Sequence, residues 1–223
     1  MIREQTLELF EAITTNRAMR RYTDEPVTEE EITTCLRAAI QAPSGGNIQP
    51  WQFLVITDPQ TKATVGEVYR RAYDRYEPAA VAATLPPRTP EDGATLARTR
   101  AASRYLADTI GQAPAMVAFL MPNIEMTMHD AEGPLDIGST FASVYPAVQN
   151  FMLAARGLGI GTSLTTVYRV YHNEFRAVLG IPERYEVVAL VPMGRPRGKF
   201  GVAPRRPLES VTHWNAFGNK RKA

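Results

Sequence analysis

The sequence has few of the residues that hold disulfides, metal clusters or membrane spans. Its 223 residues include one cysteine and three histidines. A single cysteine excludes an internal disulfide bond and any metal site that needs several cysteines. No run of about 18 apolar residues occurs, so no membrane-spanning helix is predicted. The N-terminus also lacks the basic segment and apolar run of a secretory signal peptide. We therefore expect a cytoplasmic protein with no membrane partner.

The sequence also lacks the motifs of three common catalytic centres. Its histidines, His129, His172 and His213, form no closely spaced pair of metal ligands. No G-x-S-x-G elbow occurs, because the glycines near Ser44 lie only after it. The glycines of Gly157–Gly161 follow a predicted helix, whereas a dinucleotide-binding loop follows a strand. We expect no bound metal ion and no Ser-His-Asp triad.

Charge and length give broader bounds. The formal net charge is +2, which favours no particular class of partner, and we expect no nucleic acid. The composition, 44% hydrophobic and 22% charged, is ordinary for a soluble globular protein. A chain of 223 residues is long enough for one large core, so we expect one domain spanning residues 1–223.

The clearest helix signal lies after Thr28. Thr28 and Glu31 form a capping box, in which each side chain bonds the other's backbone amide. Apolar residues then recur at helical spacing, with Cys35 on the apolar face, and Pro43 ends the pattern. Further helices are predicted at residues 4–16, 59–76, 96–108, 137–157 and 173–179. Pro146 should kink the 137–157 helix or shift its start.

Strands are predicted at residues 51–57, 115–121, 161–166 and 185–191. The apolar run of the first is nearly continuous, which is typical of a strand covered on both faces. Because strands alternate with helices, we expect an α+β fold: a three-layer α/β/α sandwich with a mixed central sheet of four to five strands, flanked by helices.

Two segments are expected to lie outside this sandwich. Residues 77–95 hold four prolines and show no sustained period. They predict an exposed excursion, about 77–105 with the helix that follows, which is either a functional lid or an insertion without a role. Residues 195–223 are rich in arginine and proline and predict an extended C-terminal tail.

The stretch Ala42–Trp51 carries the strongest ligand signal. Its glycines let the backbone approach a ligand closely, and Ser44, Asn47 and Gln49 offer hydroxyl and amide hydrogen-bond partners. A short turn needs none of these groups merely to reverse the chain. We interpret the stretch as one wall of a ligand site.

Two arginine clusters are less informative when each is considered alone. Arg17 with Arg20 or Arg21 can converge on one anion, because guanidinium groups bind phosphate bidentately. A cluster of solvated arginines fits the same pattern. Arg205 and Arg206, between two prolines, likewise indicate an extended basic segment facing solvent.

In combination, however, the motifs are similar to those of the FMN-dependent nitroreductase family. The sequence has Arg-x-x-Arg-x-Tyr at Arg17–Tyr22, then Ala42–Trp51, then Gln149–Gly159, then Arg205–Leu208. The family comprises flavoenzymes that reduce nitroaromatics, quinones and related acceptors with NAD(P)H. The resemblance implies a nitroreductase-like fold, bound FMN, NADPH or NADH as reductant, a small aromatic acceptor, and an intertwined homodimer with two flavin sites at the interface.

The resemblance assigns residues to the phosphate and ribityl end of FMN. Arg17, Ala18 and Arg20 match one family motif there. Ala18 replaces the usual serine, so a hydroxyl contact is lost while a backbone contact remains. Arg205 matches a C-terminal arginine that also reaches the phosphate, with Arg206 as the alternative if the register shifts by one.

Two further segments would contact the flavin ring. Ser44, Gly45 and Asn47 would line it, from the other subunit. The second segment passes beside the ring near N5 and comprises Leu164, Thr165 and Thr166. No catalytic side chain is expected, because the flavin itself carries two-electron hydride transfer, here in a ping-pong reaction.

Other branches of the same scaffold are flavin, quinone and enoate reductases and iodotyrosine deiodinases. The deiodinases have a threonine where Leu164 stands, and a lid with glutamate, tyrosine and lysine that grips an amino acid. Residues 67–105 contain no lysine, which disfavours deiodination. A flavin-binding storage or sensor protein is the non-enzyme alternative.

Overall fold

A four-stranded antiparallel sheet forms the centre of the protein. The computed structural model describes residues 7–123, 128–136 and 138–221. The strands are β1 (Gln52–Ile56), β2 (Ala115–Pro122), β5 (Gly161–Thr162) and β6 (Tyr185–Gly194), in the order β1-β2-β6-β5. All three pairings are antiparallel. The prediction of a mixed sheet is therefore wrong for the described strands.

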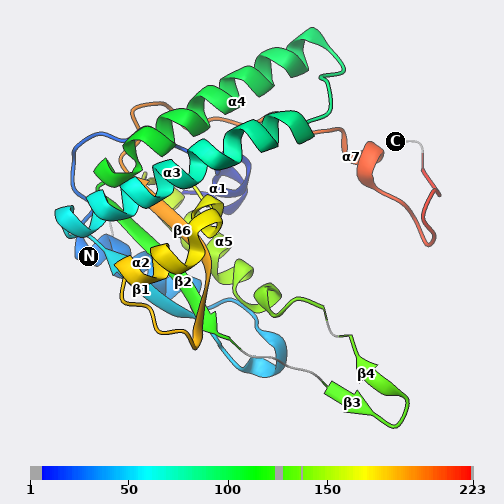
Figure 1. The fold of residues 1–223 in the computed structure, drawn as a ribbon. Coiled ribbons are helices and arrows are strands. Elements are labelled where there is room, and N and C mark those ends of the chain that lie inside the picture. The colour runs from blue at the N-terminus through cyan, green and yellow to red at the C-terminus, as the bar shows by residue number, and fades with distance from the viewer. Residues whose placement is uncertain (1–6, 124–127, 137, 222–223) are drawn as a thin grey trace.

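The connection between β1 and β2 explains the antiparallel pairing. It consists of two long helices, α3 (Pro59–Ala83) and α4 (Pro90–Thr109), which run side by side as a hairpin (Figure 1). Because a helical hairpin begins and ends on the same side, β2 starts where β1 stopped. Ile56 at the end of β1 accordingly pairs with Met116 at the start of β2.

Helices cover both faces of the sheet, which confirms the predicted three-layer α+β fold. Alternate residues of β2 enter two separate cores, as its two-residue side-chain period requires. Val117 and Phe119 pack with α2 (Glu29–Ala39) and α5 (Tyr145–Gly157). Met116 and Ala118 pack on the other face with α3, α4 and α6 (His172–Val178).

The strand β1 departs from its prediction. Gln52 and Val55 are exposed, so this strand is not covered on both faces within one chain. Its position at the edge of the sheet is the reason, since only β2 lies beside it.

Local sequence signals placed α2 correctly and α5 in part. The Thr28 hydroxyl accepts a hydrogen bond from the Glu31 amide (3.2 Å), and the Glu31 carboxylate accepts one from the Thr28 amide (3.0 Å). The predicted helix over 137–157 instead begins at Tyr145, with Pro146 in its first turn, because proline needs no amide partner there. Ile137 lies outside the described residues.

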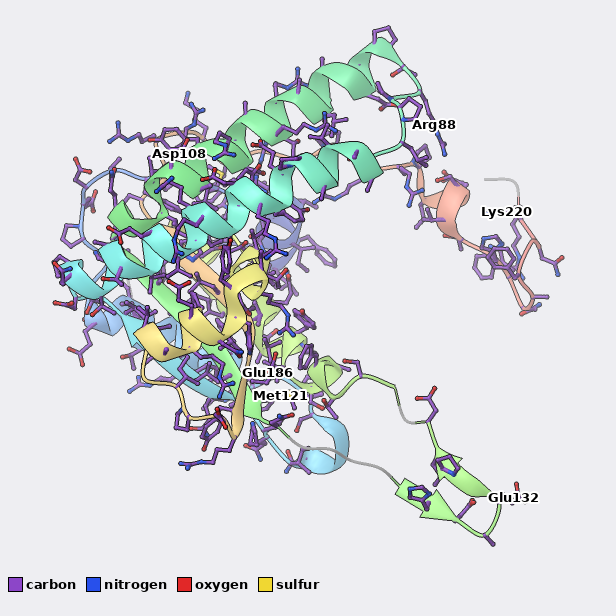
Figure 2. All side chains as sticks on the ribbon, viewed as in Figure 1. Arg88, Asp108, Met121, Glu132, Glu186 and Lys220 are labelled. Atoms are coloured by element: carbon purple, nitrogen blue, oxygen red, sulfur yellow. The ribbon has the colours of Figure 1, made fainter. Side chains whose placement is uncertain are left out.

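Residues 77–95 are mostly exposed, as expected, but most of them are helical, which the sequence did not predict. Helix α3 continues past Pro78 to Ala83, and α4 begins at Pro90. The alanines after Pro78 favour helix, and Pro90 stands in a first turn, where proline is tolerated. In Figure 2, Arg88 lies at the tip of this hairpin and Asp108 lies toward its base.

Three remaining elements lie farther from the sheet. The short helix α1 (Leu9–Thr15) contacts α5, and the predicted residues 4–6 of this helix lie outside the described residues. The hairpin of β3 (Met128–Asp130) and β4 (Gly133–Leu135), and the C-terminal arm with α7 (Leu208–Val211), extend away from the body (Figure 1). Among the described residues, no helix is long and apolar enough to cross a membrane.

Candidate functional site

The segment Arg17–Tyr22 is held against the sheet edge by a small set of contacts. The Met19 amide donates a hydrogen bond to the Thr162 carbonyl (2.8 Å). The Tyr22 hydroxyl donates to the carbonyls of Met19 (2.6 Å) and Pro192 (3.1 Å). Burial raises the pKa of Tyr22 well above its ordinary value, so this hydroxyl stays neutral. The backbone that presents Arg20 is therefore fixed.

Glycine is required where this segment crosses β5. A Cβ atom at Gly161 would lie 2.7 Å from the Cβ of Met19, closer than two carbon atoms can approach. Gly161 thus serves close packing beside the site, whereas a Cβ atom at Gly157 or Gly159 would meet open space.

A pocket of about 350 Å³ lies between α3, α4 and the segment that follows β5. Arg20 and the segment Leu164–Thr166 line one side of it. One face of α3 and one face of α4 line the other. Pockets of about 300 Å³ or more are large enough for a small organic ligand. The structure therefore brings together four of the residues predicted to bind the cofactor.

A buried hydrogen bond joins the two sides of this pocket. The hydroxyl oxygens of Tyr69, on α3, and Thr165 lie 2.7 Å apart. The Thr165 backbone also bonds Leu190 of β6 through both its amide (2.9 Å) and its carbonyl (3.0 Å). Burial raises the pKa of Tyr69 to about 12, so its hydroxyl remains protonated near neutral pH.

The turn predicted to line a ligand lies elsewhere on the chain. The Ser44 hydroxyl accepts a hydrogen bond from the Gln49 amide (3.0 Å), and the Gly45 amide donates to the Ser143 hydroxyl (3.1 Å). Asn47 has a φ of +54° and Gln49 a φ of +46°, which is uncommon for residues other than glycine. Ser44, Gly45 and Asn47 do not line the pocket.

The remaining predicted residues lie on the surface. Arg17, Ala18, Arg205 and Arg206 are exposed, and none lines the pocket. The guanidinium of Arg205 donates a hydrogen bond only to the Pro204 carbonyl (3.2 Å) within the described chain. Within one chain, the residues predicted to bind FMN therefore lie in four places: the pocket, the 44–49 turn, the start of the 17–22 segment and the C-terminal arm.

Sequence reasoning did not assign the helical wall of the pocket to the site. Tyr69, Tyr73 and Tyr76 lie along one face of α3, and Arg100 and Ser103 along one face of α4. Their spacings of three and four residues are those of a shared helical face, and this periodicity was the available signal. These residues lie in the helices predicted at 59–76 and 96–108, but only the tertiary structure brings the two faces to one pocket with Arg20.

The pocket offers tyrosine and threonine hydroxyls, aromatic rings and the guanidinium groups of Arg20 and Arg100. These groups suit a flat ligand that carries hydrogen-bonding edges and negative charge. Among the described residues, no group of three or more histidine, cysteine, aspartate or glutamate side chains gathers as a metal site.

Comparisons with known proteins identify the family of this chain. A model of the nitroreductase family matches residues 13–195. The chain is 29% identical to nitrobenzene nitroreductase of Ectopseudomonas oleovorans, with 80% of this chain and 82% of that protein covered. It is 27% identical to an NADH dehydrogenase of Thermus thermophilus, with 95% and 99% covered.

A solved structure shows the same fold. Iodotyrosine deiodinase, bound to FMN and 3-iodo-L-tyrosine, superposes with a TM-score of 0.71 at 21% identity, covering 94% of this chain and all (100%) of that chain. The family model covers most of the sequence, including β1, β2, β5 and the pocket residues. This chain belongs to the nitroreductase family.

Proposed function

We propose that this chain is an FMN-dependent oxidoreductase, which takes hydride from NADH or NADPH and reduces nitroaromatic, quinone or similar acceptors in a ping-pong reaction. Membership of the nitroreductase family supports the coarser statement, that it is an oxidoreductase. The observation that carries the finer proposal is the pocket in which Arg20 meets Leu164–Thr166.

The chemistry of this pocket fits FMN. The guanidinium of Arg20 supplies a permanent positive charge for the phosphate or the ribityl oxygens. Ser163 and Thr165 donate their amides to Pro192 (3.3 Å) and Leu190 (2.9 Å) of β6. Because alternate residues of an extended segment face opposite sides, the Leu164 amide faces away from β6. It is a backbone donor for the flavin ring, in place of the hydroxyl that Leu164 lacks.

Bound FMN supplies the two-electron chemistry, and the protein binds and orients the reactants. Thr165 has little freedom, because its amide, carbonyl and hydroxyl are all hydrogen-bonded. Tyr69 remains neutral and holds the Thr165 hydroxyl in place. The buried aromatic side chains of Tyr69 and Tyr73 exclude water from the inner end of the pocket.

We further propose that the site is completed by a second copy of the chain. Ser44, Gly45 and Asn47 do not line the pocket of their own chain, so they would contact the flavin bound by a partner. Exposed apolar side chains support an interface: Ile48, next to Asn47 in sequence, is 54% exposed, and Phe10 of α1 is 72% exposed. Exposed apolar surface is often covered at protein–protein interfaces.

The first experiment is to purify the protein and record its visible absorbance before and after incubation with FMN. We expect a yellow protein whose flavin is bleached by NADH or NADPH without oxygen. A colourless protein that takes up no FMN would contradict the proposed function. Bound FMN that neither nucleotide bleaches would instead support a flavin storage or sensor protein.

The role of Arg20 has its own test. Arg20→Ala should raise the Kd for FMN about tenfold or more, because a charge-assisted contact is lost. Arg75→Ala is the matched control, since the Arg75 guanidinium lies over the ring of Tyr171, outside the pocket. Equal FMN affinities for the two variants would exclude Arg20 from the flavin site.

Rates with several acceptors would separate the branches of the family. We expect faster turnover with nitrofurazone or menadione than with free FMN or 3-iodo-L-tyrosine. Glu77, the carboxylate that lines the pocket, forms an ion pair with Arg104. It is therefore less available to bind the ammonium group of an amino acid substrate. Deiodination at rates above nitro or quinone reduction would assign the chain to the deiodinase branch instead.

A further inference from the structure

Arg100 is a pocket-lining cation without an internal partner. It lies on α4 between Leu96 and Ser103, which line the same pocket at spacings of four and three residues. Its side chain is half-buried. Within the described residues, it forms no ion pair, and its guanidinium makes no hydrogen bond. A guanidinium placed in a concave, partly dehydrated site favours an anionic ligand.

Three other arginines of the α3–α4 hairpin show the contrast. Arg70 pairs with Asp74 (3.3 Å), Arg71 pairs with Glu174, and Arg104 pairs with Asp74 (2.6 Å) and Glu77. These ion pairs use the nearby carboxylates, and none of them reaches Arg100. Arg100 is therefore not one member of a surface ion-pair network.

The pocket consequently carries positive charge. Glu77 is the single carboxylate among the described residues that line it, and the ion pair with Arg104 neutralises its charge. The guanidinium of Arg104 also lies 4.6 Å from the centroid of the Tyr73 ring. The remaining charged groups that line the pocket are the guanidinium groups of Arg20 and Arg100. The proposed function uses Arg20 for FMN, which leaves Arg100 for another ligand.

Aromatic side chains of α3 line the same pocket as Arg100. The rings of Tyr73 and Tyr76 lie 6.0 Å apart at 55°. Tyr73 is buried, whereas Tyr76 is 44% exposed and can contact a molecule that enters from solvent. An aromatic ring beside Tyr76 with a negative substituent near Arg100 would contact both helices of the hairpin.

We propose that Arg100 binds an anionic substituent of the electron acceptor, so that the preferred acceptors are aromatic carboxylates or sulfonates. This inference rests on the proposed function. For a nitro acceptor, one NAD(P)H and one proton from solvent reduce the nitro group to a nitroso group and water, and NAD(P)⁺ is released. The anionic substituent is unchanged in this step, and its role is to orient the ring.

The test compares two acceptors of similar shape, 4-nitrobenzoate and 4-nitrobenzyl alcohol. The wild-type protein should show a kcat/KM about tenfold or more higher for the carboxylate, since a hydrogen bond to a charged group is involved. Arg100→Gln should abolish this preference, mainly through KM for 4-nitrobenzoate, and leave the neutral acceptor and the Kd for FMN nearly unchanged. Arg100→Lys should retain part of the preference.

Arg98→Gln is the matched control. Arg98 lies two residues away on α4, is exposed, does not line the pocket, and donates a hydrogen bond to Thr95 (2.9 Å). It should keep the full preference for the anion, which separates a local contact from a general effect of surface charge.

Each contrary result has a distinct meaning. A wild-type protein that binds FMN but reduces both acceptors equally would overturn this inference alone, as would an Arg100→Gln variant that keeps the preference. A weaker FMN affinity in Arg100→Gln, with the preference unchanged, would assign Arg100 to the flavin and overturn it too. A wild-type protein that binds no FMN would overturn the proposed function and this inference together.

Discussion

At the scale of single residues, Tyr69 has the most consequential position. Its hydroxyl joins α3 to Thr165 by a buried 2.7 Å hydrogen bond. Thr165 is in turn fixed to β6 through its backbone. The orientation of the Leu164–Thr166 segment therefore depends on a side chain nearly a hundred residues away in sequence. The resemblance to the family did not indicate this residue as part of the site.

Tyr69→Phe should destabilise the protein by about 1 kcal/mol, since one buried hydroxyl loses its partner while the packed ring is kept. It should also weaken FMN binding by several-fold, because the Thr165 side chain becomes free to rotate. Chemical denaturation and FMN titration measure the two effects. Tyr76→Phe is the control, because the Tyr76 hydroxyl makes no hydrogen bond within the described chain. Identical behaviour of the two variants would contradict the role of the Tyr69 hydroxyl.

Gly161 shows that a residue without a side chain can also position the site. Gly161→Ala places a Cβ atom 2.7 Å from the Cβ of Met19, so the segment that carries Arg20 must move. We expect a loss of about 1–3 kcal/mol in stability and a raised Kd for FMN. Gly157→Ala is the control, because a Cβ atom there meets open space. Unchanged FMN binding in Gly161→Ala would show that the contact with Met19 does not govern the position of Arg20.

At the scale of elements, α2 illustrates how a local signal and a distant contact act on one side chain. Glu31 completes the capping box with Thr28 and also forms an ion pair with Arg195 (2.5 Å) at the end of β6. Burial acts to raise the pKa of Glu31, but the hydrogen bonds from the Thr28 amide and Arg195 outweigh it, so the net pKa is lowered. The sequence predicted the capping box and gave no sign of the contact with Arg195.

The lowered pKa of Glu31 predicts a pH dependence of stability. A carboxylate with a lowered pKa in the folded state stabilises the protein above its ordinary pKa of 4.5, and this contribution disappears as the pH falls through the folded-state value. Glu31→Gln should therefore reduce stability at pH 7 and lessen its decline below pH 4.5. Denaturation midpoints of both proteins across this range measure the difference. Parallel curves would contradict the linkage to Glu31.

At the scale of the whole molecule, the predicted flavin contacts divide between surfaces that one chain does not bring together. The β3–β4 hairpin and the C-terminal arm also extend from the body (Figure 1). Phe217 on this arm is 94% exposed. A second copy that covers these surfaces would bury apolar area and deliver the 44–47 turn to the pocket. The proposed homodimer would account for both features with one assembly.

Light scattering should give a mass about twice the 24.7 kDa of one chain. Co-expression provides a sharper test of the shared site. Arg20→Ala and Asn47→Gly should each impair FMN binding, but a mixed dimer contains one site with neither change. About a quarter of the sites should therefore recover when dimers form at random. A monomer that retains FMN, or no recovery on mixing, would contradict a site shared between copies.

Much of the fold followed from the sequence, because its causes are local. The capping box at Thr28 and the apolar runs of β2 and β6 predicted their elements correctly, since hydrogen bonding and side-chain period act over a few residues. Helices were predicted at 59–76 and 96–108, but the continuation of α3 to Ala83 and the start of α4 at Pro90 were missed, because the prolines suggested irregular chain. The family motifs did indicate Arg20 and the 164–166 segment as ligand-binding.

The sequence by itself therefore determined which segments form helices and strands at most positions, and which motifs belong to the nitroreductase family. Only the tertiary structure decided that the sheet is antiparallel, that α3 and α4 enclose a pocket, and that Arg100 lines it with no ion-pair partner among the described residues. Strand direction, enclosure and the pairing of charges all depend on residues distant in sequence. Whether a given arginine is neutralised by a carboxylate is set by packing between elements, and no local pattern encodes it.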